Sequence, residues 1–188
     1  MTLKSKLTDT YKNNVLKPLL ARMDAWEAIV IQRPGAMQGG EASPVRFNIP
    51  REGLKLESDE PPLPGFPRSF PQMLGSMKNT RKSVLDLDRN PKPGKTQIDP
   101  ETLDALFKFS NAAGAEVSFS TVPEEWVFQD TAIAYTHAIV LVMEMSKERM
   151  ELAPNPDTAV MVHETYNALG KVSNRIADWL REHGYAAH

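Results

Sequence analysis

Residues 94–96 (Gly-Lys-Thr) have the composition of the end of a phosphate-binding loop. The complete pattern requires a glycine five residues before Gly94, so that backbone N–H groups can surround the phosphate. Arg89 occupies that position, and Pro91 and Pro93 lie between the two. Because each proline removes an N–H donor, this stretch predicts a turn rather than a nucleotide site.

His163 and Glu164 begin the pattern of a helical zinc site, in which a second histidine one turn later shares the metal. Asn167 stands where that histidine is needed, and the other histidines show no ligand spacing. The chain has no cysteine, so it supplies no thiolate to zinc or to an iron–sulfur cluster. We therefore expect no metal site within this chain.

Side chains for acid–base or nucleophilic catalysis are equally scarce. No serine lies in a Gly-x-Ser-x-Gly elbow. The carboxylate pairs 86/88 and 124/125 have the spacing of solvated surface residues, although such groups can transfer protons. We assign no catalytic residue. Trp126 and Phe128 can line a pocket, but simple packing is the better interpretation.

Composition and charge exclude several functional classes. The chain has 188 residues, which is enough for one domain with a core, and 41% of them are hydrophobic. A net charge of -2 gives no basic field for nucleic acid or anionic lipid. The longest apolar run, residues 138–143, is too short to cross a membrane. No export signal or twin arginine is present at the start, so we expect a cytoplasmic protein.

The elements that must position any site fall into two regions, residues 1–97 and 98–188. Apolar spacing predicts a helix over residues 3–32, kinked or divided at Pro18, although residues 29–31 would also suit a short strand. Beyond it, eleven of the fifteen prolines and seven of the ten glycines lie at positions 34–100. We expect a long, irregular Pro/Gly-rich arm that wraps the core or a partner.

Residues 98–188 predict an α-β-β-α core. Asp99 and Pro100 begin a helix that ends at Gly114, and alternation over residues 116–121 indicates a strand. Residues 136–145 predict a second strand, buried on both faces. A long amphipathic helix starts after Asn155 or Asp157. The expected fold class is α+β, with helices packed on a small sheet that is incomplete at its C-terminal end.

Four segments of this core resemble one known family. They are residues 137–145, Ala153-Pro154, Tyr166-x-x-Leu169-Gly170, and residues 177–187 with the pattern Ala-x-Trp-Leu-Arg-x-x-Gly-Tyr-x-Ala. Together they resemble the cobalamin-dependent reductive dehalogenases, which are related to epoxyqueuosine reductases. The resemblance covers about residues 122–188, roughly a third of the chain, and consists of helix and strand patterns rather than catalytic signatures.

The resemblance implies that this strand and helix form the front part of a nitroreductase-like, cobalamin-binding domain. In the family, the catalytic tyrosine and the cysteines of two iron–sulfur clusters follow the turn that corresponds to residues 184–187. This sequence ends first. We therefore expect an N-terminal fragment, or one subunit of a split reductase that removes halide from organohalides. Trp126 and Tyr166 are the candidates for pocket residues, and the partner is the remainder of the enzyme.

Two other functions fit the same residues. A non-catalytic binding or assembly subunit would wrap a partner, or a second copy of itself, with the arm, and its strand-helix unit would complete a shared sheet. A flavin-using, nitroreductase-like protein is the third alternative, since one fold serves several cofactors. No cluster of residues that would bind a flavin phosphate is visible, so we place it last.

Overall fold

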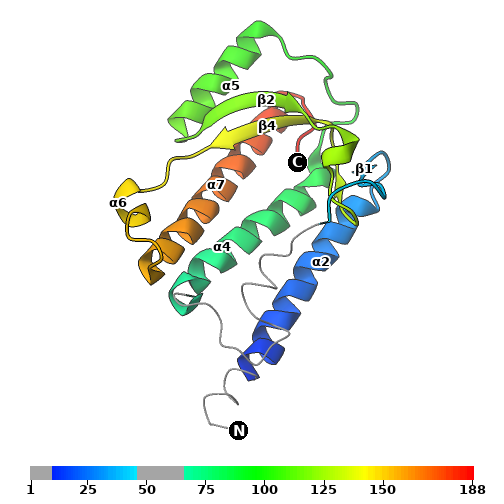
Figure 1. Ribbon diagram of the computed structural model, residues 1–188. Helices are drawn as coiled ribbons and strands as arrows, with labels where there is room; N and C mark the ends of the chain where they lie inside the picture. Colours follow the sequence, from blue (N-terminus) through cyan, green and yellow to red (C-terminus); the bar gives the residue numbers. More distant parts are fainter. Residues whose placement is uncertain (1–9, 46–65) are drawn as a thin grey trace.

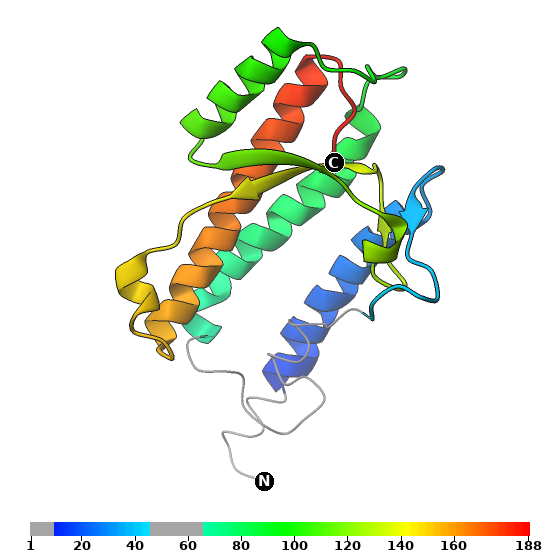
Figure 2. The same cartoon turned by 45° about the horizontal axis from the view of Figure 1, so that its top comes forward.

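Three long helices lie side by side in the computed structural model, which describes residues 10–45 and 66–188 (Figure 1). They are α2 (Lys17–Ile31), α4 (Phe66–Leu85) and α7 (Pro156–Glu182). A two-stranded sheet crosses one end of α7, and α5 (Pro100–Ala112) lies beyond it; Figure 2 shows this layer from above. The α+β class is therefore as expected, with helices packed on a small sheet.

The first helical region has two parts. A π-helical turn, η1 (Lys12–Leu16), leads into α2, where Pro18 stands in the first turn. Proline is tolerated there because its missing N–H has no partner within the helix. The π-helical turn ends at Leu16, before Pro18, and helical dihedral angles continue through Leu16 and Lys17 into α2, so the helix changes type there without a break. The alternative strand at residues 29–31 is wrong, since they belong to α2. Leu16 and Leu20 are buried against Phe70 and Met73 of α4.

Helix α4 corrects the prediction of an irregular arm. Residues 66–85 form a helix of twenty residues with Pro71 inside it. Prolines 67 and 71 lie in the first two turns, and no proline follows in residues 72–85, where amphipathic spacing can operate. The remainder of the predicted arm contains η2 (Asp86–Arg89) and β1 (Met37–Gln38). Residues 46–65 of that arm lie outside the described residues.

The predicted cap of α5 is confirmed. Asp99 accepts hydrogen bonds from the backbone N–H of Thr102 at 2.8 Å and from its hydroxyl at 2.7 Å. Both bonds hold the pKa of the Asp99 carboxyl below its ordinary value. Gly114 follows the helix with φ of +85°, a conformation that residues with a Cβ rarely adopt. The chain turns at this glycine and enters the strand that begins at Glu116.

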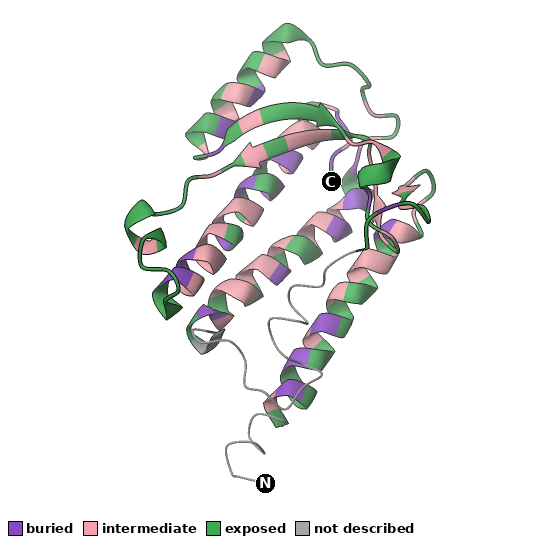
Figure 3. Ribbon diagram, viewed as in Figure 1, coloured by how far each residue is buried: buried purple, intermediate pink, exposed green. Residues whose placement is uncertain are grey.

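Strands β2 (Glu116–Thr121) and β4 (His137–Val142) pair antiparallel. Their inner face, including Ile139 and Leu141, packs on α5 and α7 in the main hydrophobic cluster. The outer face is open: Val140 is 44% exposed and Val142 is 57% exposed (Figure 3). The expectation that this strand is buried on both faces is wrong for the described residues, because helices cover only one side of the sheet.

The remaining elements attach to the ends of this layer. β1 pairs antiparallel with β3 (Ala132–Ile133), beside the short helix η3 (Glu124–Trp126). Helix α6 (Lys147–Met150) is held to α7 by Arg149, whose guanidinium lies 2.6 Å from Glu164. Asn155 caps α7 by accepting a hydrogen bond from Asp157 N–H at 2.9 Å, as one of the two predicted caps.

Candidate functional site

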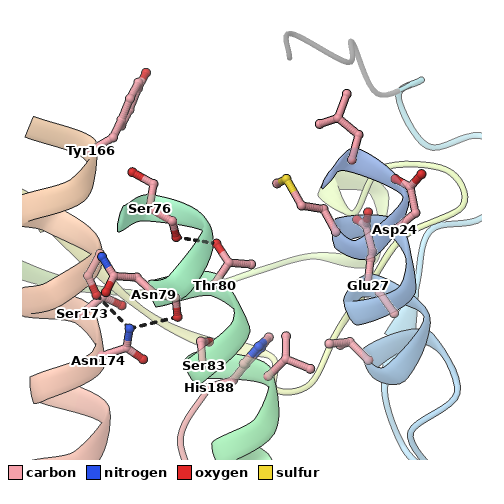
Figure 4. Close-up of a pocket in the computed structure, with 16 residues that line it drawn as sticks. Asp24, Glu27, Ser76, Asn79, Thr80, Ser83, Tyr166, Ser173, Asn174 and His188 are labelled. Atoms are coloured by element: carbon pink, nitrogen blue, oxygen red, sulfur yellow. Dashed lines mark hydrogen bonds between the residues drawn. The ribbon is translucent and has the colours of Figure 1, made fainter. Parts of the chain in front are cut away.

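A groove of about 390 Å³ lies between α2, α4 and α7 (Figure 4). Its volume is at the lower end of the range of about 300–1,000 Å³ that is usual for small-molecule sites. Polar side chains line the sides formed by α4 and α7, whereas α2 contributes mainly apolar and acidic ones. Ala132 of β3 and His188 also line the groove.

Helix α4 turns a row of hydroxyl groups toward the groove. Ser76, Thr80 and Ser83 are spaced by four and three residues, which places them on one face of a helix. The Ser76 hydroxyl donates to the carbonyl oxygen of Gln72 at 3.1 Å, and the Thr80 hydroxyl donates to that of Ser76 at 3.2 Å. Both protons are therefore directed back to the helix, and the oxygen lone pairs remain for other donors.

The adjacent face of α4 is interlocked with α7 through amides and glycines, a contact that we call the amide seam, and Asn79, Gly170 and Asn174 of this seam also line the groove. Asn79 donates to the backbone carbonyl of Asn167 at 3.0 Å, and Asn174 donates to the carbonyls of Asn79 and Gly170, both at 3.0 Å. A Cβ on Gly170 would lie 3.0 Å from the Asn79 amide nitrogen. A Cβ on Gly75 would lie 2.5 Å from the Asn167 amide oxygen. A side chain at position 75 would therefore overlap Asn167, and one at position 170 would make a tight contact with Asn79.

Helix α2 forms the third side of the groove with Leu20, Met23 and Val30, together with the carboxylates of Asp24 and Glu27. No lysine or arginine lines the groove among the residues that the structure describes. The combination of aliphatic side chains and carboxylates makes this side amphipathic and negatively charged.

An ionic cluster closes the amide seam at one end. Lys82 of α4 forms ion pairs with Asp86 and with Asp178 of α7, the latter at 2.8 Å. Burial alone would lower the pKa of Lys82, but its hydrogen bonds to Asp178 and Asp86 outweigh burial and raise it. Burial would raise the pKa of Asp86, but hydrogen bonds from Lys82 and Arg89 lower it. Both residues are therefore held in their charged forms.

Arg181 connects this cluster to the last residues of the chain. Its side chain is only 6% exposed and donates to Asp178, to the Asn90 amide oxygen and to the Ala187 carbonyl, each at 2.9 Å. The Ala187 N–H donates to the same Asn90 oxygen at 3.0 Å. These bonds place His188 at the groove, where burial, followed by the charges of Arg181 and Arg33, lowers its pKa.

The two pocket residues predicted from sequence occupy different places. Tyr166 lines the groove, with 58% of its surface exposed. Trp126 lies in η3, is 66% exposed, and does not line the groove. Sequence reasoning missed the polar row on α4, although the spacing of Ser76, Thr80 and Ser83 would have revealed it once a helix was assumed.

The described residues do not fit the cofactors that the resemblance implies as a complete site. They contain no group of three or more His, Cys, Asp or Glu side chains placed to hold a metal ion, and the whole sequence lacks cysteine. A corrinoid is larger than the drug-sized ligands that a groove of about 390 Å³ accommodates. These helices can therefore form one wall of a corrinoid site at most.

Comparison of the chain with protein-family models, with curated proteins and with solved structures finds no match. In the described residues, no helix has both the length and the apolar character that crossing a membrane requires. The geometry of the groove, the sheet edge and the sequence resemblance are therefore the grounds for assigning a function.

Proposed function

We propose that this chain is the N-terminal module of a cobalamin- and iron–sulfur-dependent reductase that acts on organohalides. The observation that carries the proposal is that the segments behind the resemblance pack together as one unit. Ile139 and Leu141 of β4 belong to the same hydrophobic cluster as Val172, Ile176 and Trp179 of α7. The resemblance rests on sequence patterns alone, and it is better supported when the segments that carry it pack into one hydrophobic core.

The end of the chain belongs to this unit. Tyr185 forms a parallel β-bridge with Lys95, and its hydroxyl donates to the Gln97 carbonyl at 3.1 Å. The Gly184 carbonyl accepts from Lys95 N–H at 2.8 Å. The turn at residues 184–185, which is part of the resemblance, is therefore held against the core. This supports a defined position for a further part of the enzyme next to it.

The edge of β4 supports the presence of additional sheet. Within the described residues β4 pairs only with β2, and residues 138–143 contain neither a charge nor a proline. Exposed edge strands are normally protected by lysine, proline or a covering element. An unprotected edge with Val140 and Val142 exposed beside it is expected where a further strand and a covering layer are added by the rest of an enzyme.

In this proposal the chain provides a wall and a docking edge, and no reaction step is assigned to its residues. Bound cobalamin supplies the reduction of the carbon–halogen bond, and the iron–sulfur clusters are ligated by the remainder of the enzyme, because this chain has no cysteine. Tyr166, at the rim of the groove, is the residue that we place nearest the cofactor or substrate.

Metal analysis of the native protein tests the proposal. The polypeptide or complex that contains this sequence is purified from its source cells without oxygen, and its cobalt and iron are measured by mass spectrometry. We expect both metals, together with halide release from a halogenated phenol when a reduced viologen supplies electrons. A native species that is free of cobalt and inactive toward organohalides would overturn the reductase proposal.

The open edge of β4 also favours a second function, a non-catalytic assembly subunit. In that case a native complex forms without cobalt, and backbone amides of residues 138–142 exchange hydrogen much more slowly in the complex than in the isolated chain. Val140→Lys should weaken the complex, whereas Val45→Lys, at a position that is 77% exposed in the loop after β1 and outside β4, should not. Equal exchange in the free and bound chain would exclude this docking mode.

A further inference from the structure

Three polar side chains that line the groove, those of Ser76, Thr80 and Asn174, share a hydrogen-bonding polarity that neither proposed function uses. The hydroxyl protons of Ser76 and Thr80 are committed to carbonyl oxygens of α4. A hydroxyl that has donated its proton can still accept through its lone pairs. At these two positions the groove therefore presents acceptors and no donors.

Asn174 adds a further acceptor. Both bonds from its amide nitrogen go to backbone carbonyls, those of Asn79 and Gly170, and only the NH₂ group can donate to carbonyls, so the orientation of the amide is fixed. Asn174 is 7% exposed, and its amide oxygen accepts no hydrogen bond from the residues that the structure describes. Asn174 is among the residues that line the groove, and Figure 4 shows its side chain between α7 and α4, next to Asn79 and Ser173.

Negative charge reinforces these acceptors. Asp24 and Glu27 line the opposite side of the groove, and no lysine or arginine among the described residues does so. Both carboxylates also take part in other interactions, and they contribute to the site through their charge. Leu20 and Met23, which lie beside them, provide an aliphatic surface between the acidic and the hydroxyl-lined sides.

The geometry points to a binding site for an aliphatic primary ammonium group in the groove between α2, α4 and α7. An alkylammonium has three donors and no acceptor, which matches the hydroxyl and amide oxygens, and its positive charge matches the negative charge of the α2 side. Its carbon chain matches the aliphatic side chains of α2. The inference does not rest on the proposed reductase activity, because it follows from the lining of the groove alone.

Calorimetric titration of the 188-residue chain with putrescine, a four-carbon diamine, tests the inference at low ionic strength. Butanediol and succinate are the neutral and anionic analogues of similar length. Because hydrogen bonds to charged groups are roughly twice as strong as neutral ones, we expect putrescine to bind at least about tenfold more tightly than butanediol. We expect no binding of succinate. Equal binding of the diamine and the diol, or no binding of the diamine, would overturn the inference.

Thr80→Val locates the site. It removes the acceptor while keeping the shape of the side chain, and we expect the affinity for putrescine to fall about tenfold. Thr165→Val is the matched control, since Thr165 makes the same kind of bond, to the Met161 carbonyl at 3.0 Å, but does not line the groove. Thermal unfolding of both variants shows that each is folded. Equal affinities for putrescine in the two variants would place the amine outside the groove.

A lysine side chain of another protein presents the same ammonium on an alkyl chain. Acetyl-lysine-amide, with its free side-chain ammonium, is therefore the second probe. Tighter binding of this probe than of putrescine assigns the site to a protein lysine, and weaker binding assigns it to a free amine. Loss of both interactions in Thr80→Val is expected in either case.

Discussion

The two sides of α4 meet their neighbours in opposite ways. Toward α7, glycines and amides bring the helix backbones close together, and Asn79, Asn167 and Asn174 hydrogen-bond directly across the contact. Toward α2, the same helix presents short hydroxyl side chains to a groove. One side of α4 thus makes a tightly packed contact, and the other side lines an open groove whose side chains contribute little to the stability of the fold. Substitutions should be costly on the first side and inexpensive on the second.

Arg181→Met should produce the largest loss of stability. It removes a nearly buried guanidinium, so that the Ala187 carbonyl loses its donor, while Asp178 and the Asn90 oxygen each lose one donor and keep another, from Lys82 and the Ala187 N–H respectively. Breaking a buried pair from one side costs about 3 kcal/mol, which urea denaturation can measure. Arg175→Met on the same helix is the control, because Arg175 is exposed and lies over the Phe109 ring at 5.5 Å. Similar losses in both variants would contradict a special role for Arg181.

Gly75→Ala should have the next largest effect. Alanine favours a helix by about 1 kcal/mol over glycine, but the new Cβ would lie 2.5 Å from the Asn167 amide oxygen. Asn167 is buried and donates to Gln72 at 2.7 Å, so it has little freedom to move. We expect a net loss of about 2 kcal/mol in the free energy of unfolding, measured by urea denaturation.

The double variant Gly75→Ala with Asn167→Ala separates overlap from helix propensity. If overlap with Asn167 causes the loss, the two substitutions together should destabilise less than the sum of their separate effects. Strict additivity would show that the amide seam tolerates the extra methyl group and that the cost has another origin.

Acidification should weaken the ionic cluster at the end of the amide seam by a smaller amount. The pKa of Asp86 is lowered from its ordinary value of 3.8. Its contribution to stability is therefore present above that value and is lost as the pH falls through the lower pKa of the folded state. Asp86→Asn should flatten the decline of melting temperature below about pH 4. Asp104→Asn, at an exposed pair with Lys108, should leave that decline unchanged.

Ser76→Ala should have the smallest effect and define the groove side of α4. Alanine has a higher helix propensity than serine, and the lost bond runs only to the Gln72 carbonyl of the same helix. We expect a change within about 0.5 kcal/mol in either direction, measured by urea denaturation. A loss as large as that for Gly75→Ala would mean that the two sides of α4 are equally constrained.

Local signals in the sequence predicted the elements whose ends are chemically marked. Asp99 and Pro100 predicted the start of α5, and Asn155 was one of two predicted starts of α7. The alternation of apolar and polar residues over 116–121 predicted β2. Each of these signals acts within a few residues, because a cap contacts the helix that it begins. They were sufficient for the α-β-β-α order and for the inner face of the sheet.

The groove and the amide seam could not be predicted from the sequence, because they form between helices that are far apart along the chain. Pro67 and Pro71 suggested an irregular segment, yet α4 is stabilised by α7, whose Asn167 lies 88 residues from its partner Asn79. Similarly, the apolar run of β4 indicated burial on both faces. It contains no signal that Val140 and Val142 are exposed. Asn174 is a polar residue that is buried, and its burial becomes explicable only from its hydrogen bond to the facing helix α4.

The distance in sequence between the two halves of the amide seam has a consequence for synthesis of the protein. Hydrogen bonds between α4 and α7 join residues 88 to 95 positions apart. At about 5–20 residues per second, a ribosome needs on the order of ten seconds to make the intervening chain. During that interval nascent α4 carries an unsatisfied helix face, so this protein should depend on chaperones that bind nascent chains until α7 emerges.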